Sequence, residues 1–381
     1  MYTEKIRIYP NKTQIKTIDR ILWNCKNLYN YLLDLNIRTY KKTGKGLLGT
    51  KLDQPAQKFI GNKIPSRVRT DVWRRLTSAF SRFFKKQCRF PKFKSKNKYL
   101  SFTLSTYKCG FNFDKNHIKV NGVGNIKAVF TRDLLGTPKA CTIKKMKSGN
   151  YYAFITLDDK NVEKIKIEDR KSFISFDLGV SKFLTDQDGN YLSSPRFLRK
   201  NLRKLRRAQR ELSRKQRGSK NRRKARIKVA KLHEKVYNTR RDYHFKVAYY
   251  LVTNYNEIYC EDLRVKSMFP GKSRQAKKAR RALYDVALYS FLVVLQQMCE
   301  VYSCKFTKVD PQYTSQICSN CGTIVKKSLS DRIHNCPHCG LVIDRDVNAA
   351  RNILQRGKNL SVGTTGGANA PQLVEISIPG I

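Results

Sequence analysis

Hydrophobic positions in the first 87 residues change from a period of two to a period near 3.6. Residues 4–9 alternate polar and apolar side chains, which predicts a β-strand that Pro10 ends. Farther along, apolar side chains recur at steps of three and four. A second run of this kind begins at Pro65, with arginines on its opposite side. This periodicity predicts a helical unit over residues 12–87.

Short apolar runs follow as far as residue 170, and Gly, Asn, Asp and Pro separate them. Such spacing favours a small antiparallel sheet or barrel. The strand at 4–9 is expected to join this sheet, because the helical unit then becomes an insertion. The sequence therefore predicts a β-barrel formed by residues 1–11 and 88–168, with residues 12–87 inserted as a helical lobe.

From residue 171 onward strand and helix patterns alternate, which indicates an α/β core. The buried strand at 173–176 leads into two short strands around a turn at 186–190, and Gly218 breaks a long helical pattern into a hairpin. The later elements expected are a strand at 257–260, a loop at 270–278, an apolar helix at about 282–302, a strand at 305–309 and a helix from Asp344. Residues 357–381 are rich in Gly, Asn and Thr and predict a disordered tail.

Charge points to a polyanionic partner. The 381 residues carry a formal net charge of +51, and residues 196–241 hold 21 Lys and Arg against 2 acids. Such a chain repels itself unless a polyanion neutralises it, so nucleic acid is the expected partner and an anionic membrane surface the rival. No secretory leader or uninterrupted apolar stretch of about 18 residues is evident, so we expect no membrane partner. The expected nucleic-acid contacts are Arg74, Arg75, Arg199, Arg203, Arg206, Arg207, Arg210, Arg222 and Arg223.

Four of the eleven cysteines form two Cys-x2-Cys pairs separated by 14 residues: Cys318, Cys321, Cys336 and Cys339. This spacing is typical of a tetrahedral zinc site, and four thiolates leave no open position for chemistry, so the zinc is structural. The alternative is four incidental thiols. The other seven cysteines follow no regular framework, which favours a reducing compartment.

Three acids stand at positions that suit a divalent metal centre. Asp177 and Glu261 each follow a short apolar run, and Asp346 opens the last helix. Asp344 competes with Asp346, since either could cap that helix, and we prefer Asp346 as the metal ligand. Carboxylates bind Mg²⁺ or Mn²⁺, and two such ions activate a water for phosphodiester hydrolysis. The plainer reading of each acid by itself is a helix or turn cap.

Taken together, these motifs resemble the TnpB family, whose members are encoded beside bacterial insertion sequences and are related to type V CRISPR effectors and Fanzor. The resemblance rests on residues 176–180, 261–263, 309–322, 336–340 and 344–353, with a shorter match at 90–94. It implies an RNase H-like (RuvC) nuclease core over residues 169–312 and 343–356, interrupted by a zinc ribbon at 313–342. The barrel would then be a wedge domain and the inserted helices a recognition lobe.

The resemblance also implies a function. Members use a guide RNA from the end of the element and cut double-stranded target DNA beside a short motif. Asp177, Glu261 and Asp346 match their catalytic acids. We expect one protein chain per RNA, in the cytoplasm of a prokaryote at the nucleoid. Two alternatives remain: an RNase H-like transposase that transfers DNA strands, and a non-catalytic nucleic-acid-binding regulator.

Overall fold

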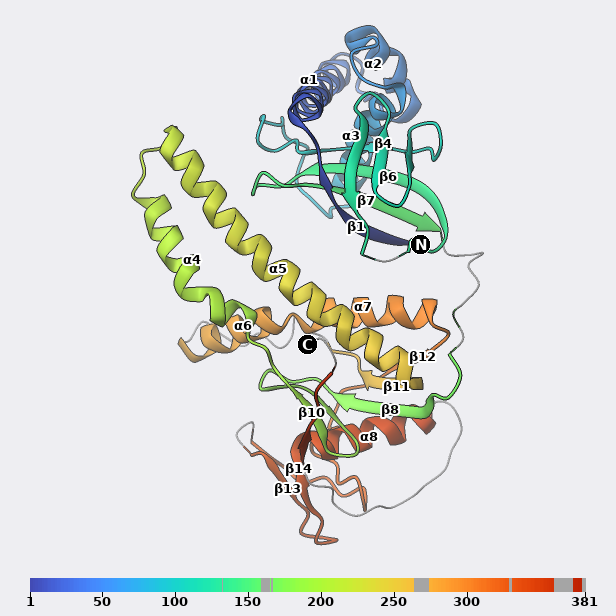
Figure 1. Cartoon of the computed structure of the whole chain (residues 1–381), viewed down its shortest axis with the longest axis vertical. Helices are drawn as coiled ribbons and strands as arrows, with labels where there is room; N and C mark the ends of the chain where they lie inside the picture. The colour runs from blue at the N-terminus through green and yellow to red at the C-terminus, as the bar shows by residue number, and fades with distance from the viewer. Residues whose placement is uncertain are drawn as a thin grey trace. The chain divides into compact units, whose positions relative to one another are not determined.

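The computed structural model describes residues 1–131, 133–158, 165, 167–263, 274–328, 331–359 and 373–378, with side chains omitted at 274–278. The chain divides into two compact units, Met1–Val162 and Glu163–Ile381 (Figure 1). This boundary lies close to the one expected between the barrel and the nuclease core.

The first unit is a seven-stranded antiparallel sheet with a helical insertion. Its strands are β1 (Tyr2–Tyr9), β2 (Ser101–Leu104), β3 (Phe111–Phe113), β4 (His117–Val120), β5 (Gly124–Val129), β6 (Thr137–Lys145) and β7 (Tyr151–Asp158). The strand order is β2-β6-β7-β1-β5-β4-β3, so β1 lies inside the sheet between strands that follow it by more than 100 residues. Within the described residues the terminal strands β2 and β3 do not pair, so the sheet is nearly closed rather than a fully hydrogen-bonded barrel.

Helices fill the interval between β1 and β2, as the periodicity predicts. They are α1 (Lys12–Thr43), the 3-10 turn η1 (Gly49–Leu52), α2 (Asp53–Ile60) and α3 (Ser66–Phe84). Asn11 caps α1 by accepting from the backbone of Gln14, whose side chain accepts from the backbone of Asn11. Gly44 ends the helix at φ 68°, a conformation that costs glycine little. The apolar faces of these helices and of the sheet share one core.

The second unit is an α/β domain. Its main strands are β8 (Lys171–Asp177), β9 (Lys182–Asp186), β10 (Asn190–Ser193), β11 (Tyr255–Glu261), β12 (Lys305–Val309) and β15 (Val374–Glu375), in the order β12-β11-β8-β9-β10-β15. β11 runs parallel to β8 and β12, whereas β9 runs antiparallel to β8. The helices are α4 (Phe197–Ser213), α5 (Lys220–Asn254), α6 (Arg274–Val286), α7 (Leu288–Val301) and α8 (Arg345–Asn359). A two-stranded ribbon, β13 (Ile333–Asn335) and β14 (Val342–Asp344), precedes α8.

One expected helix is two. Instead of a single helix at about 282–302, α6 and α7 meet at Ala287, which has a φ of 54°. The expected loop at 270–278 is helical from Arg274, and its earlier part lies outside the described residues. The stretch Ala279–Val301 is also long and apolar enough to cross a membrane by composition, which the sequence reading did not anticipate. It is broken at Ala287, and α7 packs its apolar residues into the core of the second unit, so we assign it as a core element.

The expectation of a disordered tail over 357–381 is wrong for part of that range. Helix α8 continues to Asn359, and β15 pairs in parallel with β10. Ile378 is 6% exposed and packs into the core of the second unit. Glycine content at 363–367 suggested disorder, but the apolar residues after it supply a sheet edge strand and a core contact. Residues 360–372 and 379–381 lie outside the described residues.

Candidate metal centres

Two of the three expected acids end neighbouring parallel strands. β8 and β11 pair in parallel with Phe176 opposite Cys260, and the next residues along the two strands are Asp177 and Glu261. Because parallel strands present their carboxyl ends at the same edge of a sheet, both side chains emerge there. Gly179 follows in a tight turn, where a Cβ would lie 2.6 Å from the Lys182 carbonyl oxygen. The turn therefore requires glycine two residues after the first acid.

Helix α8 brings the third acid to the same edge. It packs on β8, β9 and β11 (Figure 1), and the Ser175 hydroxyl on β8 donates to the Ala350 carbonyl at 2.8 Å. Asp346 lies in the first turn of this helix. Three elements that are distant in the sequence thus carry the three acids.

The structure separates the roles of the two competing aspartates. Asp344 accepts from the backbone N–H of Asp346 at 2.8 Å and from Lys182 at 2.9 Å, so it caps α8 and pairs with a cation. Asp346 lies 3.5 Å from the guanidinium of Arg345, and its charge acts on Asp177. These contacts favour Asp346 as the member of the acid group.

Burial and like charge strain this group electrostatically. Burial, followed by the charges of Glu261 and Asp346, holds the pKa of Asp177 well above its usual range. Burial also raises the pKa of Glu261, while a hydrogen bond from Thr314 and the charge of Arg356 oppose the rise. Buried carboxylates that repel one another are stabilised by a bound cation. The donor set, three hard carboxylates, fits Mg²⁺ or Mn²⁺.

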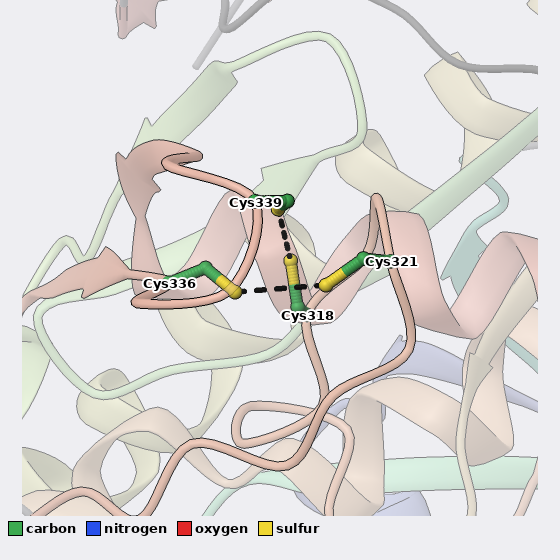
Figure 2. A group of neighbouring side chains, drawn as sticks. All are labelled: Cys318, Cys321, Cys336 and Cys339. Carbon is green, nitrogen blue, oxygen red and sulfur yellow. Dashed lines mark hydrogen bonds between the residues drawn. The ribbon is translucent and has the colours of Figure 1, made fainter.

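The four cysteines form the second candidate centre. Their sulfur atoms all lie within 4.8 Å of one another and point inward (Figure 2). Sγ–Sγ distances of 3.6 Å join Cys318 to Cys339 and Cys321 to Cys336. A tetrahedron with Zn–S bonds of about 2.3 Å requires about 3.8 Å between sulfurs, so the four thiolates fit zinc. Among the described residues the three acids do not form a group this tight.

Each cysteine pair is built as a knuckle. In the first, Gly322 donates to the Cys318 carbonyl at 2.9 Å, and in the second, Gly340 donates to the Cys336 carbonyl at 3.0 Å. Both glycines have positive φ, 77° and 72°. Residues with a Cβ rarely adopt this conformation, which explains the glycine after each second cysteine.

Three buried polar residues beside these centres were not predicted from the sequence: Thr314, Asn348 and Asn352 are at most 3% exposed. Two asparagines four residues apart on one face of a helix, among Val and Ala, were the available signal. Polar groups at a buried position require partners.

The expected arginine contacts divide into two groups. Six are exposed on the α4–α5 hairpin and remain candidates, namely Arg199, Arg203, Arg206, Arg207, Arg210 and Arg223. Arg74 is exposed on α3. In contrast, Arg222 donates to two backbone carbonyls near the end of α4, at 2.7 and 3.0 Å. Arg75 pairs with Asp71 at 2.9 Å and donates to β2. These last two guanidinium groups serve the fold, which argues against their expected role.

Three family profiles match the chain. Residues 157–271 match the "Probable transposase" family of IS605 OrfB proteins, and residues 289–353 match the Cas12f1-like TNB domain. Residues 3–45 match a helix-turn-helix domain of the same OrfB proteins. In the structure this last stretch is one strand and the single 32-residue helix α1, so it is not a helix-turn-helix.

Two solved structures share the fold. A Cas12f1–sgRNA–target DNA complex matches with a TM-score of 0.54 at 15% identity, over 90% of this chain and 82% of that one. The mini-RNA-guided endonuclease CRISPR-Cas phi3 matches with a TM-score of 0.50 at 10% identity, over 93% and 92% of the two chains. At these identities the likeness concerns the fold alone.

Relatives in sequence give the family. A "Putative RNA-guided DNA endonuclease" of Streptomyces pristinaespiralis is 27% identical over 382 residues, covering 97% of this chain and 92% of the relative. The "Putative RNA-guided DNA endonuclease InsQ" of Escherichia coli K12 is 31% identical over 306 residues, covering 77% and 75%. The TnpB-like protein L79 of Acanthamoeba polyphaga mimivirus is 36% identical over 140 residues, which are 36% of this chain and 27% of that protein. The chain therefore belongs to the TnpB family.

Proposed function

We propose that this protein is an RNA-guided DNA endonuclease of a transposable element, which hydrolyses phosphodiester bonds at a RuvC-type centre. The observation that carries the proposal is the convergence of Asp177, Glu261 and Asp346 at one sheet edge, where burial and mutual repulsion raise the pKa of Asp177. Relatives named as RNA-guided DNA endonucleases support the same activity. The strand-transfer alternative has weaker support, since it rests on a family description and on relatives named putative transposases that match only 36–37% of this chain.

Each acid has a distinct part in holding Mg²⁺ or Mn²⁺. Burial and the charges of Glu261 and Asp346 raise the pKa of Asp177, so a bound cation would stabilise its carboxylate form. Glu261 receives a hydrogen bond from Thr314, and Asp346 is flanked by Arg345. Mg²⁺ or Mn²⁺ held by these acids would supply the activation of a water and the neutralisation of the leaving oxygen of the cleaved strand. The protein's own contribution is to hold three half-buried carboxylates at one edge of the sheet.

Cations on the α4–α5 hairpin suit the backbone of a nucleic acid. The hairpin extends from the second unit as two long helices, and its exposed arginines offer many phosphate contacts with no base reading. A guide RNA paired with target DNA needs this type of contact, because base pairing supplies the sequence recognition. We propose that a wedge-type sheet and helical lobe in the first unit complete the complex, one chain per guide RNA, in the prokaryotic cytoplasm at the nucleoid.

Sequencing the RNA that co-purifies with the protein is the first test, and a defined RNA is expected. That RNA, reprogrammed at its guide segment, should direct cleavage of a plasmid library only with Mg²⁺ or Mn²⁺. Asp177→Ala protein is the matched control and should bind the RNA without cutting. Joined strand-transfer products in place of hydrolysed ends would establish the transposase, and no cutting under any guide would favour the non-catalytic regulator.

A further inference from the structure

A side chain from the zinc-ribbon segment contacts one of the metal-binding acids directly. The Thr314 hydroxyl donates to Glu261 Oε1. It also lies 3.2 Å from the Pro311 carbonyl, but a hydroxyl has one proton, and the carboxylate is the closer and charged acceptor. Thr314 is 3% exposed, so water does not replace this bond. One Glu261 oxygen is thereby fixed, and the orientation of the carboxylate follows from the position of Thr314.

The position of Thr314 is in turn set by α8. Asn352 donates to the carbonyl oxygens of Thr314 and Ile317, both at 2.7 Å. Asn348 donates to the same Ile317 carbonyl at 2.7 Å and accepts from the backbone N–H of Ser319 at 2.9 Å. Both asparagines are at most 3% exposed. Two side chains on the helix that carries Asp346 therefore hold the turn between Thr314 and the first zinc knuckle.

These bonds form one continuous path. It runs from the backbone of Ser319, beside the zinc ligand Cys318, to Asn348 and through the shared Ile317 carbonyl to Asn352. From Asn352 it continues to Thr314 and ends on Glu261. The path joins the ribbon to α8 and to β11. Of these, α8 carries Asp346 and β11 carries Glu261. Thr314, Asn348 and Asn352 are buried, so removing one of these donors leaves its acceptor unsatisfied rather than hydrated.

We propose that Thr314 is a positioning residue for Glu261, and that Asn352 and Asn348 extend its hold to the zinc knuckle, so that the ribbon sets the affinity of the carboxylate centre for divalent cations. The inference rests on the proposed function only for the identity of that centre. Hydrogen-bond partners of metal-binding carboxylates commonly change metal affinity by about 10-fold or more when removed. The zinc ribbon would thereby act on the carboxylate centre through this path.

The test compares Thr314→Val, which keeps the shape and loses the hydroxyl, with Thr314→Ser, which keeps the hydroxyl. Mn²⁺ binding to the full-length protein is measured by electron paramagnetic resonance, after subtraction of the signal from Asp177→Ala protein. Thr314→Val should bind Mn²⁺ about 10-fold more weakly, and Thr314→Ser should bind like the native protein. Zinc content should remain one per chain in both, and cleavage by Thr314→Val should recover at high Mg²⁺. Native Mn²⁺ affinity in Thr314→Val would overturn the proposal.

Asn352→Leu provides a second test, should Thr314→Val lose its zinc or its fold. It should also weaken Mn²⁺ binding, and the Thr314→Val/Asn352→Leu double variant should be little weaker than either single variant, because both act on one path. Gln355→Leu is the control: it removes a 2.9 Å bond to the Ser319 carbonyl outside the path and should leave Mn²⁺ affinity native. If Gln355→Leu weakens Mn²⁺ binding equally, any loss of contact between the ribbon and α8 has the same effect, and the specific path is refuted.

The two proposals fail separately. Mn²⁺ binding needs neither guide nor target, so a protein that never cuts DNA would refute the proposed function and leave the Thr314 result standing. A protein that cuts under guidance while Thr314→Val binds Mn²⁺ normally would refute only the positioning role.

Discussion

Replacing Gly357 with alanine should damage the metal centre from a distance. Gly357 lies on α8, where a Cβ would be 2.1, 2.7 and 2.8 Å from three ring atoms of Tyr259 on β11. Carbon atoms pack at about 3.5–4.0 Å, so the helix or the ring must move by more than about 1 Å. Tyr259 is 2% exposed and its hydroxyl is bonded to Glu257, which leaves the ring little room. The helix is therefore the part that moves, and it carries Asp346.

Two opposing contributions decide whether Gly357→Ala raises or lowers the stability of the fold. Alanine is about 1 kcal/mol more favourable than glycine within a helix, whereas overpacking a core costs about 1–3 kcal/mol. The overlap of more than about 1 Å places Gly357→Ala at the upper end of that cost, so we expect net destabilisation of about 1–2 kcal/mol. A shift of about 1 Å in a reacting group can lower a rate about 100-fold. Guided cleavage rates and hydrogen exchange of the α8 amides measure the two effects.

A second substitution shows whether the clash between the new Cβ and the Tyr259 ring causes the loss of stability and cleavage. Tyr259→Val removes the ring, so Gly357→Ala/Tyr259→Val should recover exchange protection and cleavage relative to Gly357→Ala alone. A Gly357→Ala protein that is about 1 kcal/mol more stable than native and cuts at the native rate would show that helix propensity wins and that the packing argument fails.

Three further outcomes are expected. Cys318→Ser should release zinc, by elemental analysis, and loosen α8, because structural zinc contributes about 10 kcal/mol or more to such a ribbon; a Cys318→Ser protein that cuts at the native rate would contradict this. Asp346→Ala should abolish cutting, whereas Asp344→Ala should keep measurable cutting after losing a helix cap worth about 1 kcal/mol; the reverse ranking would make Asp344 the ligand. The pKa of Asp177 is higher in the folded than in the unfolded protein, so the protonated carboxyl favours folding. This contribution to the free energy of unfolding is fully present below about pH 3.9 and is lost as pH rises through the raised pKa. Metal-free Asp177→Asn protein should therefore be more stable than native at pH 7–8, with the difference shrinking toward pH 4 in thermal scans, and Mg²⁺ should stabilise only the native protein.

Local patterns predicted the elements that local physics determines. The strand at the N-terminus, α1, α3, the basic hairpin and the two knuckles all follow from periodicity, caps and cysteine spacing. The strand β1 was expected to join the first sheet and does so, but its interior position between β7 and β5 was not predicted. By contrast, β3 and α2 have three and eight residues, too few to give a clear period.

What escaped prediction depends on contacts between distant segments. The break at Ala287 is invisible in an apolar run that continues through it. The docking of residues 373–378 depends on a free edge of β10, which no local pattern reveals. The sequence already favoured Asp346 over Asp344, but the ion pair between Asp344 and Lys182, 162 residues away, which adds support for that preference, could not be foreseen. Likewise Arg75 and Arg222 look like their exposed neighbours in sequence, and only their backbone and carboxylate partners distinguish them.

The place of the ribbon in the chain follows from the same contacts. A helix with two buried asparagines is costly unless each finds partners, and those of α8 find theirs on the turn that leads into the first knuckle. The same turn has two buried carbonyl groups, at Thr314 and Ile317, and among the described residues only α8 donates hydrogen bonds to them. Helix and turn therefore specify each other's position, and a mispositioned helix would leave at least three buried polar groups unpaired at about 1–3 kcal/mol each. Because the ribbon precedes α8 directly, a short stretch of chain, from Cys339 to Asp346, also links zinc binding to the position of Asp346.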